Sequence, residues 1–379
     1  MILIYFIISL FVLYSFIIIY YWLAWKSIPD YNPAGTSAQI KISVIIPARN
    51  EEENIGQLLQ ALQEQTYPKE LVEVIVIDDH STDRTAAIVQ QFSFVKLLQL
   101  KDDGINSYKK KAIETGVAAA TGELIVTTDA DCLPTKEWLK IIASFKEENK
   151  SAFIAAPVVL TPDPSPLHGE GRRLLQIFQA MDFMILQGIT GAAVSKKKLS
   201  MCNGANLAYE RKVFYEVNGF AGVDHIASGD DMLLMHKIWK ENPDRVHYLK
   251  SKAAIVVTEP MKTWRAFFNQ RIRWASKAKN YDDKRIFAVL LLVYLFNLSF
   301  LGLTVAGFFC HYYWICLGGL WLAKTIIELP FIISVATFFG KQSLVKYFFF
   351  FQPMHILYTI TSGLFGQLGK YEWKGRKVR

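Results

Sequence analysis

Two aspartates separated by one residue, Asp129 and Asp131, stand at the end of the apolar run Leu124 to Thr128. Carboxylates at this spacing can point together at an oxygen-seeking cation such as Mg²⁺ or Mn²⁺. A cation held there could bridge to phosphate oxygens and stabilise a leaving diphosphate. The pair therefore indicates a divalent metal site suited to phosphate chemistry.

Two further acidic pairs adjoin apolar elements, and each also has a purely structural interpretation. Asp78 and Asp79 end a buried strand pattern, and with the polar residues up to Asp83 they could form an Asx-type turn that caps the following helix. Asp230 and Asp231 precede an apolar helix pattern, for which one carboxylate suffices as the N-cap. The spare carboxylate could accept the proton of an attacking hydroxyl, the role of a general base.

The pentapeptide Gln270 to Trp274 contains two arginines and lies shortly before a long apolar segment. With the aromatic residues upstream of it, the segment can be interpreted as an interfacial amphipathic helix with snorkelling arginines. Alternatively, the planar guanidinium of Arg273 could meet a diphosphate while Trp274 offers a flat apolar face to a sugar ring. The pentapeptide alone leaves both interpretations open.

Alternating strand and helix patterns connect these polar sites. Apolar runs predict strands at Ser43 to Ile46, Val72 to Ile77 and Leu124 to Thr128, and helical spacing predicts helices at Glu51 to Gln65 and Thr85 to Phe92. This alternation favours an α/β domain with a mainly parallel sheet that is covered on both faces. Because such sheets bind ligands beyond the carboxyl ends of their strands, the loops after these three strands should face one crevice.

Four long apolar segments flank this region, at residues 2–25, 286–310, 311–340 and 347–368. Each has about the length needed to cross a hydrocarbon core of roughly 30 Å. Lys26 follows the first segment, which has no charged side chain, so the middle of the chain is predicted to be cytoplasmic. Three complete C-terminal crossings would place the basic end of the chain outside, so one of these segments is expected to be re-entrant or interfacial.

The 379-residue chain is 52% hydrophobic and carries a formal net charge of +8. Such a charge suits a nucleic acid, an anionic lipid or a phosphorylated substrate, because all three are polyanions. The basic residues gather near the predicted membrane boundaries, at residues 262–285 and 370–379. This distribution favours contact with membrane lipids and argues against a nucleic-acid partner.

Taken in order, these elements resemble glycosyltransferase family 2. The resemblance runs from about Ile42 to Trp274 and rests on the stretches SVIIPARNE, VIDDHSTDRT, TDAD, GDDMLL and QRIRW. It implies a GT-A fold, which is Rossmann-like, in a cytoplasmic domain with N- and C-terminal transmembrane helices. The QRIRW motif is similar to that of ceramide glucosyltransferase and of cellulose, hyaluronan and poly-N-acetylglucosamine synthases.

The resemblance also implies roles for the acidic pairs. Asp79 would read the nucleotide base, and Asp129 and Asp131 would form the DxD motif, whose last acid usually holds the metal. Asp231 would be the catalytic base beside Asp230. The family usually has a Glu-Asp pair at these two positions, so the base is assigned here by spacing.

Basic and aromatic residues complete the expected site. Of three adjacent lysines, spacing favours Lys109 as the match to a basic residue of the family. The expected membrane-proximal, acceptor-side residues are Gln270, Arg271 and Trp274. The expected donor-binding residues are Pro47, Arg49, Glu51, Asp79, Lys109, Asp129 and Arg273.

The sequence thus predicts an anchor, a linker, a GT-A catalytic domain, an interfacial segment, three C-terminal transmembrane segments and a basic tail. The corresponding residues are 1–25, 26–41, 42–260, 261–285, 286–368 and 369–379. The predicted activity is inverting, Mg²⁺- or Mn²⁺-dependent transfer of a sugar from a nucleotide diphosphate. The resemblance implies that this nucleotide is UDP. The predicted acceptor is a lipid-linked or membrane-proximal hydroxyl in the synthesis of a cell-envelope glycan or glycolipid.

Three other functions compete with this prediction. A processive polysaccharide synthase would need a channel, for which the few apolar segments offer little material. A nucleotidyltransferase would not explain the QRIRW motif. A non-catalytic subunit that binds nucleotide sugars would tolerate loss of an acidic pair, whereas all three pairs are intact.

Overall fold

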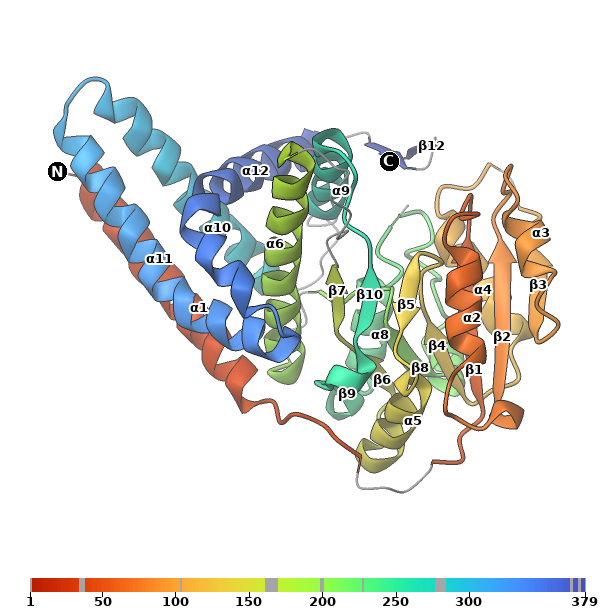
Figure 1. The fold of residues 1–379 in the computed structure, drawn as a ribbon. Helices are drawn as coiled ribbons and strands as arrows, with labels where there is room; N and C mark the ends of the chain where they lie inside the picture. Colours follow the sequence, from red (N-terminus) through yellow and green to blue (C-terminus); the bar gives the residue numbers. More distant parts are fainter. Residues whose placement is uncertain are drawn as a thin grey trace. The chain divides into compact units, whose positions relative to one another are not determined.

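The structure, a computed structural model, describes residues 2–33, 38–102, 104–160, 170–197, 201–226, 228–276, 284–368, 371–373 and 376–378. These residues form two compact units, whose elements are labelled in Figure 1. The helical unit gathers the described parts of residues 1–27, 162–192 and 260–373. The sheet unit gathers those of residues 28–161, 193–259 and 374–379.

Within the described residues, a seven-stranded sheet in the order β3-β2-β1-β4-β8-β6-β9 is the centre of the sheet unit. Its strands are β1 (Ile42–Ala48), β2 (Val72–Asp78), β3 (Val95–Gln99), β4 (Leu124–Thr127), β6 (Phe153–Ala155), β8 (Leu207–Glu210) and β9 (Val246–Tyr248). β1 runs parallel to β2 and β4, and β2 runs parallel to β3, whereas β8 is antiparallel to β4 and β6. The prediction of a mainly parallel α/β sheet is therefore confirmed.

The remaining strands and the helices of the sheet unit surround this sheet. They are β5 (Cys132–Pro134), β7 (Val158–Leu160), β10 (Val256–Thr258), α2 (Ile55–Gln63), α3 (Thr85–Val89), α4 (Tyr108–Ala119), α5 (Trp138–Asn149), α7 (Arg211–Glu216) and α8 (Met232–Glu241). On α4, Gly116 lies so close to the sheet that a Cβ there would come within 2.6 Å of Ile45 and 2.9 Å of Ile77. This close approach seats the first turn of α4 beside the carboxyl ends of β1 and β2.

The predicted strands all form, and the boundaries of the predicted strands and helices differ from the sequence pattern by up to four residues. β1 was expected to stop at Pro47, yet it continues to Ala48, because Pro47 keeps its register opposite Ile77 without needing an N–H donor there. α2 begins at Ile55 rather than at Glu51. The residues between β1 and α2 form a turn that is hydrogen-bonded to the loop after β2.

The helical unit contains long apolar helices. Its described elements are α1 (Ile2–Ser27), α6 (Glu170–Ser195), α9 (Trp264–Ser276), α10 (Lys284–Gly307), α11 (Tyr312–Phe339) and α12 (Phe348–Leu368), and the chain ends with β11 (Tyr371–Trp373) and β12 (Arg376–Val378). By length and composition, four described helical segments could cross a membrane: α1, residues 173–195 of α6, α10 and α11. The sequence analysis did not predict α6, whose apolar stretch is interrupted by buried polar residues such as Gln179 and Asp182.

A buried ionic network joins three of these helices. Lys324 and Glu328, one turn apart on α11, are 1% and 7% exposed, and the Lys324 ammonium lies 2.7 Å from Glu328 Oε1. Gln352 of α12 accepts a hydrogen bond from Lys324 and donates one to Glu328, both at 2.6 Å, and the Tyr14 hydroxyl of α1 also donates to Glu328. Since ionisable groups in an apolar bundle require partners, this network ties α1 and α12 to α11.

Contacts along the helices also define their directions. α1 and α11 run in the same direction, because Tyr14 meets Glu328 and Trp25 packs on Phe338, and Figure 1 shows these helices side by side. α10 leads directly into α11 and forms a hairpin with it, in which Gly307 lies against Trp314. The end of α1, the start of α10 and the end of α11 therefore lie on one side of the bundle.

The first residues of α12 pack beside the first half of α11, where Phe349 stacks on Trp321 at 5.3 Å and Gln352 accepts a hydrogen bond from Lys324. α12 starts soon after the end of α11, and near its own end Gly366 lies against Ala275, which shortly precedes α10. By length and composition, α12 is not among the four described helical segments that could cross a membrane. It is therefore our candidate for the non-crossing segment that the sequence predicts.

This arrangement predicts the membrane topology. A topology reporter fused after Lys26 and one fused after Arg379 should both show the cytoplasmic signal, which is the result expected when α1, α10 and α11 cross and neither α6 nor α12 does. A reporter at Phe309, in the α10–α11 turn and 87% exposed, should show the opposite side and serves as the control. Opposite signals from the Lys26 and Arg379 fusions would mean that α6 or α12 crosses.

Candidate active site

The carboxyl ends of three parallel strands meet at one edge of the sheet. Asp78 of β2 lies opposite Ala48 of β1, and Thr127 of β4 lies opposite Ile45 on the other side of β1. The loops that carry Asp79 and Asp129 therefore leave the sheet at the same edge, with β1 between them. The strand register agrees with the part of the sequence-based expectation that brings these loops to one edge of the sheet. That they face one crevice stays a prediction.

Lys109 joins two of the acidic pairs. Its Nζ lies 2.7 Å from Asp129 Oδ1 and 3.1 Å from Asp230 Oδ2, in an environment where the lysine side chain is 22% exposed and the Asp230 side chain 11%. Burial alone would lower the pKa of Lys109, but the carboxylates of Asp129, Asp230 and Asp231 outweigh it and raise this pKa above its ordinary value. Lys109 is therefore a fixed positive charge among converging carboxylates.

Asp231 occupies the start of α8, as the sequence indicated for one member of its pair. It is the N-cap residue, and its Oδ1 accepts a hydrogen bond of 2.7 Å from the backbone N–H of Met232. Asp230, one residue earlier, faces Lys109 instead. The helix cap and the contact with the lysine thus fall on different members of the pair.

Asp131 lies two residues beyond Asp129 in the turn before β5 and is partly exposed. Its Oδ1 accepts a weak hydrogen bond of 3.6 Å from the Cys132 thiol. Burial, together with the carboxylates of Asp131 and Asp129, raises the pKa of that thiol well above its ordinary value, so Cys132 is a neutral neighbour of the acidic pair.

The donor set at Asp129 and Asp131 fits a hard divalent cation of the Mg²⁺ or Mn²⁺ type. Both residues offer carboxylate oxygens, and such cations are often held by one or two carboxylates together with substrate phosphates. Among the described residues, no group of three or more His, Cys, Asp or Glu side chains is placed to hold a metal.

In the loop after β2, Asp79 contacts Arg49. The Arg49 guanidinium donates to the backbone carbonyl of Asp79 at 2.8 Å and lies 3.9 Å from Asp79 Oδ1, which also contacts His80 Nδ1 at 3.0 Å. Asp78 and Asp83 perform the turn-forming role that the sequence allowed for this cluster, since each accepts backbone N–H groups of the same loop. Asp79 instead contacts Arg49 and His80.

Pro47 and Glu51 lie in the neighbouring segment. Pro47 is within β1, and the Glu51 N–H donates to Thr85 Oγ1 at 2.8 Å, which fastens the segment after β1 to the loop after β2. The ring of His80 meets the ring of Tyr108 edge-on at 6.1 Å, and Tyr108 directly precedes Lys109. The loop carrying Asp79 thus contacts the helix start that carries Lys109.

The start of α4 also holds the loop that leads to Asp230, a role that the sequence analysis did not predict. Lys110 is 1% exposed and donates to the carbonyls of Val223 and Ile226 at 2.6 and 2.7 Å. Asn106 donates to the carbonyl of His225 at 2.7 Å, and the Ser107 hydroxyl donates to that of Asp224. Side chains from 106 to 110 therefore fix the backbone from 223 to 226. In the sequence, Lys110 is one of three adjacent lysines, and nothing separates it from its neighbours.

The sequence also carried no indication that Gly204 contributes to the site. A Cβ at this position would lie 3.0 Å from Asp230 Oδ2 and 3.1 Å from Lys109 Nζ. The absence of a side chain therefore leaves room for the ion pair between Lys109 and Asp230. No pattern in the single sequence marks this glycine.

The other predicted site residues belong to α9 in the helical unit. Gln270, Arg273 and Trp274 are partly exposed, whereas Arg271 is buried and pairs with Asp182 of α6 at 2.7 Å. Arg271 thus has a buried carboxylate partner inside the helical unit, and it also contacts Gln270 and Trp274 of the same motif.

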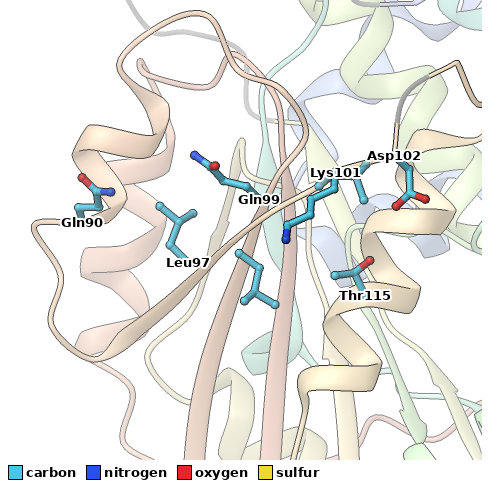
Figure 2. A pocket seen from close by; sticks show the side chains of 8 residues that line it. Gln90, Leu97, Gln99, Lys101, Asp102 and Thr115 are labelled. Atoms are coloured by element: carbon cyan, nitrogen blue, oxygen red, sulfur yellow. The ribbon is translucent and has the colours of Figure 1, made fainter.

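A cavity of about 650 Å³ lies beside β3, the edge strand of the sheet (Figure 2). Its lining residues are Gln90, Leu97, Leu98, Gln99, Leu100, Lys101, Asp102 and Thr115. Within the described residues, none of the predicted site residues lines it. The candidate site is therefore the carboxylate–lysine cluster and not this cavity.

The buried contacts of Lys110 generate a stability prediction. Replacing Lys110 with Met should lower the free energy of unfolding by about 2–4 kcal/mol, because two buried carbonyls lose a charged donor. Replacing Lys111, which is 42% exposed and lies 3.8 Å from Asp102, should change it by less than about 0.5 kcal/mol. Denaturant unfolding of both variants measures the difference, and equal effects would contradict the assignment of Lys110.

Comparison with known proteins is consistent with this geometry. Residues 43–217 match the family model described as Glycosyl transferase family 2. The chain is 29% identical over 242 residues to the probable glycosyltransferase YdaM of Bacillus subtilis, which covers 62% of this chain and 54% of that protein. It is 30% identical over 130 residues to the beta-monoglucosyldiacylglycerol synthase of Synechocystis sp., which covers 32% of this chain and 27% of that protein. The matched segments thus span about half or less of these curated relatives.

The fold is similar to that of the mannosyltransferase PcManGT from Pyrobaculum calidifontis, whose structure was solved in complex with GDP-Man and Mn²⁺. The TM-score is 0.60 at 20% sequence identity, covering 96% of this chain and 99% of that one. None of these three proteins is named as a cellulose or hyaluronan synthase, so that narrower part of the resemblance gains no support from them. The chain carries, over residues 43–217, a glycosyltransferase family 2 domain with a GT-A-like fold, together with helices long and apolar enough to cross a membrane.

Proposed function

We propose that this chain is an inverting, metal-dependent glycosyltransferase that moves a sugar from a nucleotide diphosphate to a hydroxyl of a lipid-linked or membrane-proximal acceptor. The observation that carries the proposal is the contact of Lys109 with both Asp129 and Asp230. It joins the proposed metal pair to the proposed base pair, which are about one hundred residues apart in the chain. A site that brings donor and acceptor together requires this proximity.

Asp231 is the proposed general base. It would take the proton of the acceptor hydroxyl as that oxygen attacks the anomeric carbon from the face opposite the diphosphate, which inverts the carbon. Lys109, which contacts Asp230, would offset the negative charge of this acidic pair, and the N-cap hydrogen bond holds Asp231 at the start of α8. One displacement of this kind needs no nucleophile from the enzyme.

The donor would lie along the sheet edge between the loops of Asp79 and Asp129. Asp79 and the neighbouring residues Pro47, Arg49 and Glu51 are proposed to bind the nucleotide, and Lys109 and Arg273 its phosphates. Asp129 and Asp131 would hold Mg²⁺ or Mn²⁺, which when bound would offset the charge of the leaving diphosphate. The similarity of fold to PcManGT, which was solved with GDP-Man and Mn²⁺, supports a metal-bound nucleotide sugar as the donor class. UDP remains our first choice of nucleotide.

The acceptor is proposed from the membrane helices and from one relative. Helices long and apolar enough to cross a bilayer would keep the catalytic domain at its cytoplasmic surface. The relative named beta-monoglucosyldiacylglycerol synthase supports a lipid acceptor with a single added sugar. Gln270 and Trp274 are proposed to lie on the acceptor side.

We keep residues 42–260 as the proposed catalytic domain, 261–285 as the interfacial segment and 286–368 as the C-terminal membrane region, in an integral membrane protein of the cell membrane.

The assignment of the base gives a direct test. Asp231→Asn should lower the transfer rate by about 10²–10⁴-fold, because the amide cannot accept the proton, while the affinity for the donor stays within about threefold. Asp224→Asn, at a position 70% exposed on the nearby loop, is the matched control and should keep full activity. Near-normal transfer by the Asp231 variant, with donor still bound, would rule Asp231 out as the base.

The activity itself is tested with the purified protein in nanodiscs and a panel of nucleotide sugars. We expect release of a nucleoside diphosphate that stops on stringent chelation and returns with Mn²⁺ or Mg²⁺. Mass analysis of the extracted lipid should show one added sugar. A long polymer would support the processive alternative, and donor binding without turnover would support a non-catalytic subunit.

A further inference from the structure

In the helical unit, α6 fixes the backbone that enters α9. The Gln179 side chain is 1% exposed, and its amide forms two hydrogen bonds with the backbone of Met261, accepting from the N–H at 2.9 Å and donating to the carbonyl at 3.0 Å. Met261 precedes α9 by three residues. This double contact sets the position at which α9 begins.

Asp182, three residues after Gln179 and on the same face of α6, makes the second contact. Its Oδ2 accepts a hydrogen bond of 2.7 Å from Arg271 Nη2, and both side chains are 3% exposed. Its Oδ1 accepts a bond of 2.6 Å from the Tyr358 hydroxyl and lies 3.3 Å from His355 Nδ1. Asp182 therefore brings α6, α9 and α12 to one point.

Aromatic rings enclose the Arg271 guanidinium. It lies 4.2 Å from the centre of the Trp274 ring and 4.8 Å from that of Phe267. A charge that is desolvated in this way depends on its carboxylate partner, because an unpaired buried charge is strongly destabilising. Arg271 therefore has one favourable direction within the unit, which is toward Asp182.

The direction of Arg271 determines that of Arg273. Residues in an α-helix turn by 100° each, so a side chain two positions further leaves the helix about 200° away, on the opposite side. Arg271 is buried and Arg273 is partly exposed, as this geometry requires. Any rotation of α9 that moved Arg273 would have to pull Arg271 away from Asp182.

We propose that Asp182 is the positioning residue for Arg273. By holding Arg271 inside the helical unit, Asp182 fixes the rotation of α9, and Gln179 fixes its start. Arg273 is thereby kept on the outward side of α9, where it is available to a diphosphate. The catalytic part of this inference rests on the proposed function, in which Arg273 binds the donor phosphates.

Activity tests the proposal through a double-mutant cycle. Asp182→Asn keeps the size of the side chain but removes its charge, and we expect it to lower kcat/KM by about 10- to 100-fold through misplacement of Arg273. In the Arg273→Ala background, Asp182→Asn should cost less than about threefold, because no guanidinium remains to be misplaced. Glu328→Gln is the matched control, since it also weakens a buried ion pair of the helical unit but touches α11, α12 and α1 instead of α9. The effects of Glu328→Gln and Arg273→Ala on kcat/KM should multiply.

A second measurement does not depend on activity. For this measurement the four native cysteines are replaced by serine, and a single reactive cysteine is introduced as Arg273→Cys. The rate at which a water-soluble maleimide labels position 273 should change at least fivefold when Asp182→Asn is added. Glu328→Gln should leave this rate within twofold. If Asp182→Asn does not fold, Tyr358→Phe, which removes one hydrogen bond to Asp182, should change the rate about two- to fivefold.

The two measurements separate failure of the inference from failure of the proposed function. Multiplicative effects of Asp182→Asn and Arg273→Ala on kcat/KM, or an unchanged labelling rate, would overturn the positioning role. If the wild-type protein transfers no sugar, the proposed function fails, and the labelling rate alone decides whether Asp182 sets the direction of position 273.

Discussion

The sheet unit depends on one electrostatic constraint, which is that carboxylates from separate loops share the charge of a single lysine. Both the Asp129 and the Asp230 carboxylate lie within 3.1 Å of the same lysine nitrogen, so the two would repel each other without a cation between them. Lys109 supplies that cation from the first turn of α4. The site therefore contains a positive charge of its own, where the phosphates of the proposed donor would lie.

The start of α4 performs two tasks because successive helical residues point in different directions. Lys109 faces the carboxylates, and Lys110 turns into the protein and binds carbonyls of the loop before Asp230. Lys111 faces outward toward Asp102. A single turn thus supplies the charge of the site and holds the loop that completes it. The close packing of Gly116 on Ile45 and Ile77 fixes this turn relative to the sheet.

The helical unit uses buried charges in a different way. Lys324 with Glu328 and Arg271 with Asp182 are each enclosed by apolar side chains and supported by further polar groups, including Gln352 in the first pair and Tyr358 in the second. Desolvated charges of this kind contribute specificity more than net stability, because a helix that shifted would leave one of them unpaired. The two pairs explain how helices whose other contacts are largely apolar keep one arrangement.

The sequence by itself determined the class of the fold, the order of the acidic pairs and the apolar segments, because strand and helix patterns and turn chemistry are local properties. It also placed Asp79, Asp129, Asp131 and the pair at 230 and 231 next to strand ends or a helix start. Tertiary structure decided the rest. Which of three adjacent lysines meets Asp129, why Gly204 has no side chain, and that Arg271 turns inward to Asp182 all depend on contacts between residues 20 to 95 positions apart. A single sequence carries no local signal for such contacts. The apolar stretch of α6 is visible in its composition, but the partners of its buried polar residues, such as Met261 for Gln179 and Arg271 for Asp182, lie in distant segments.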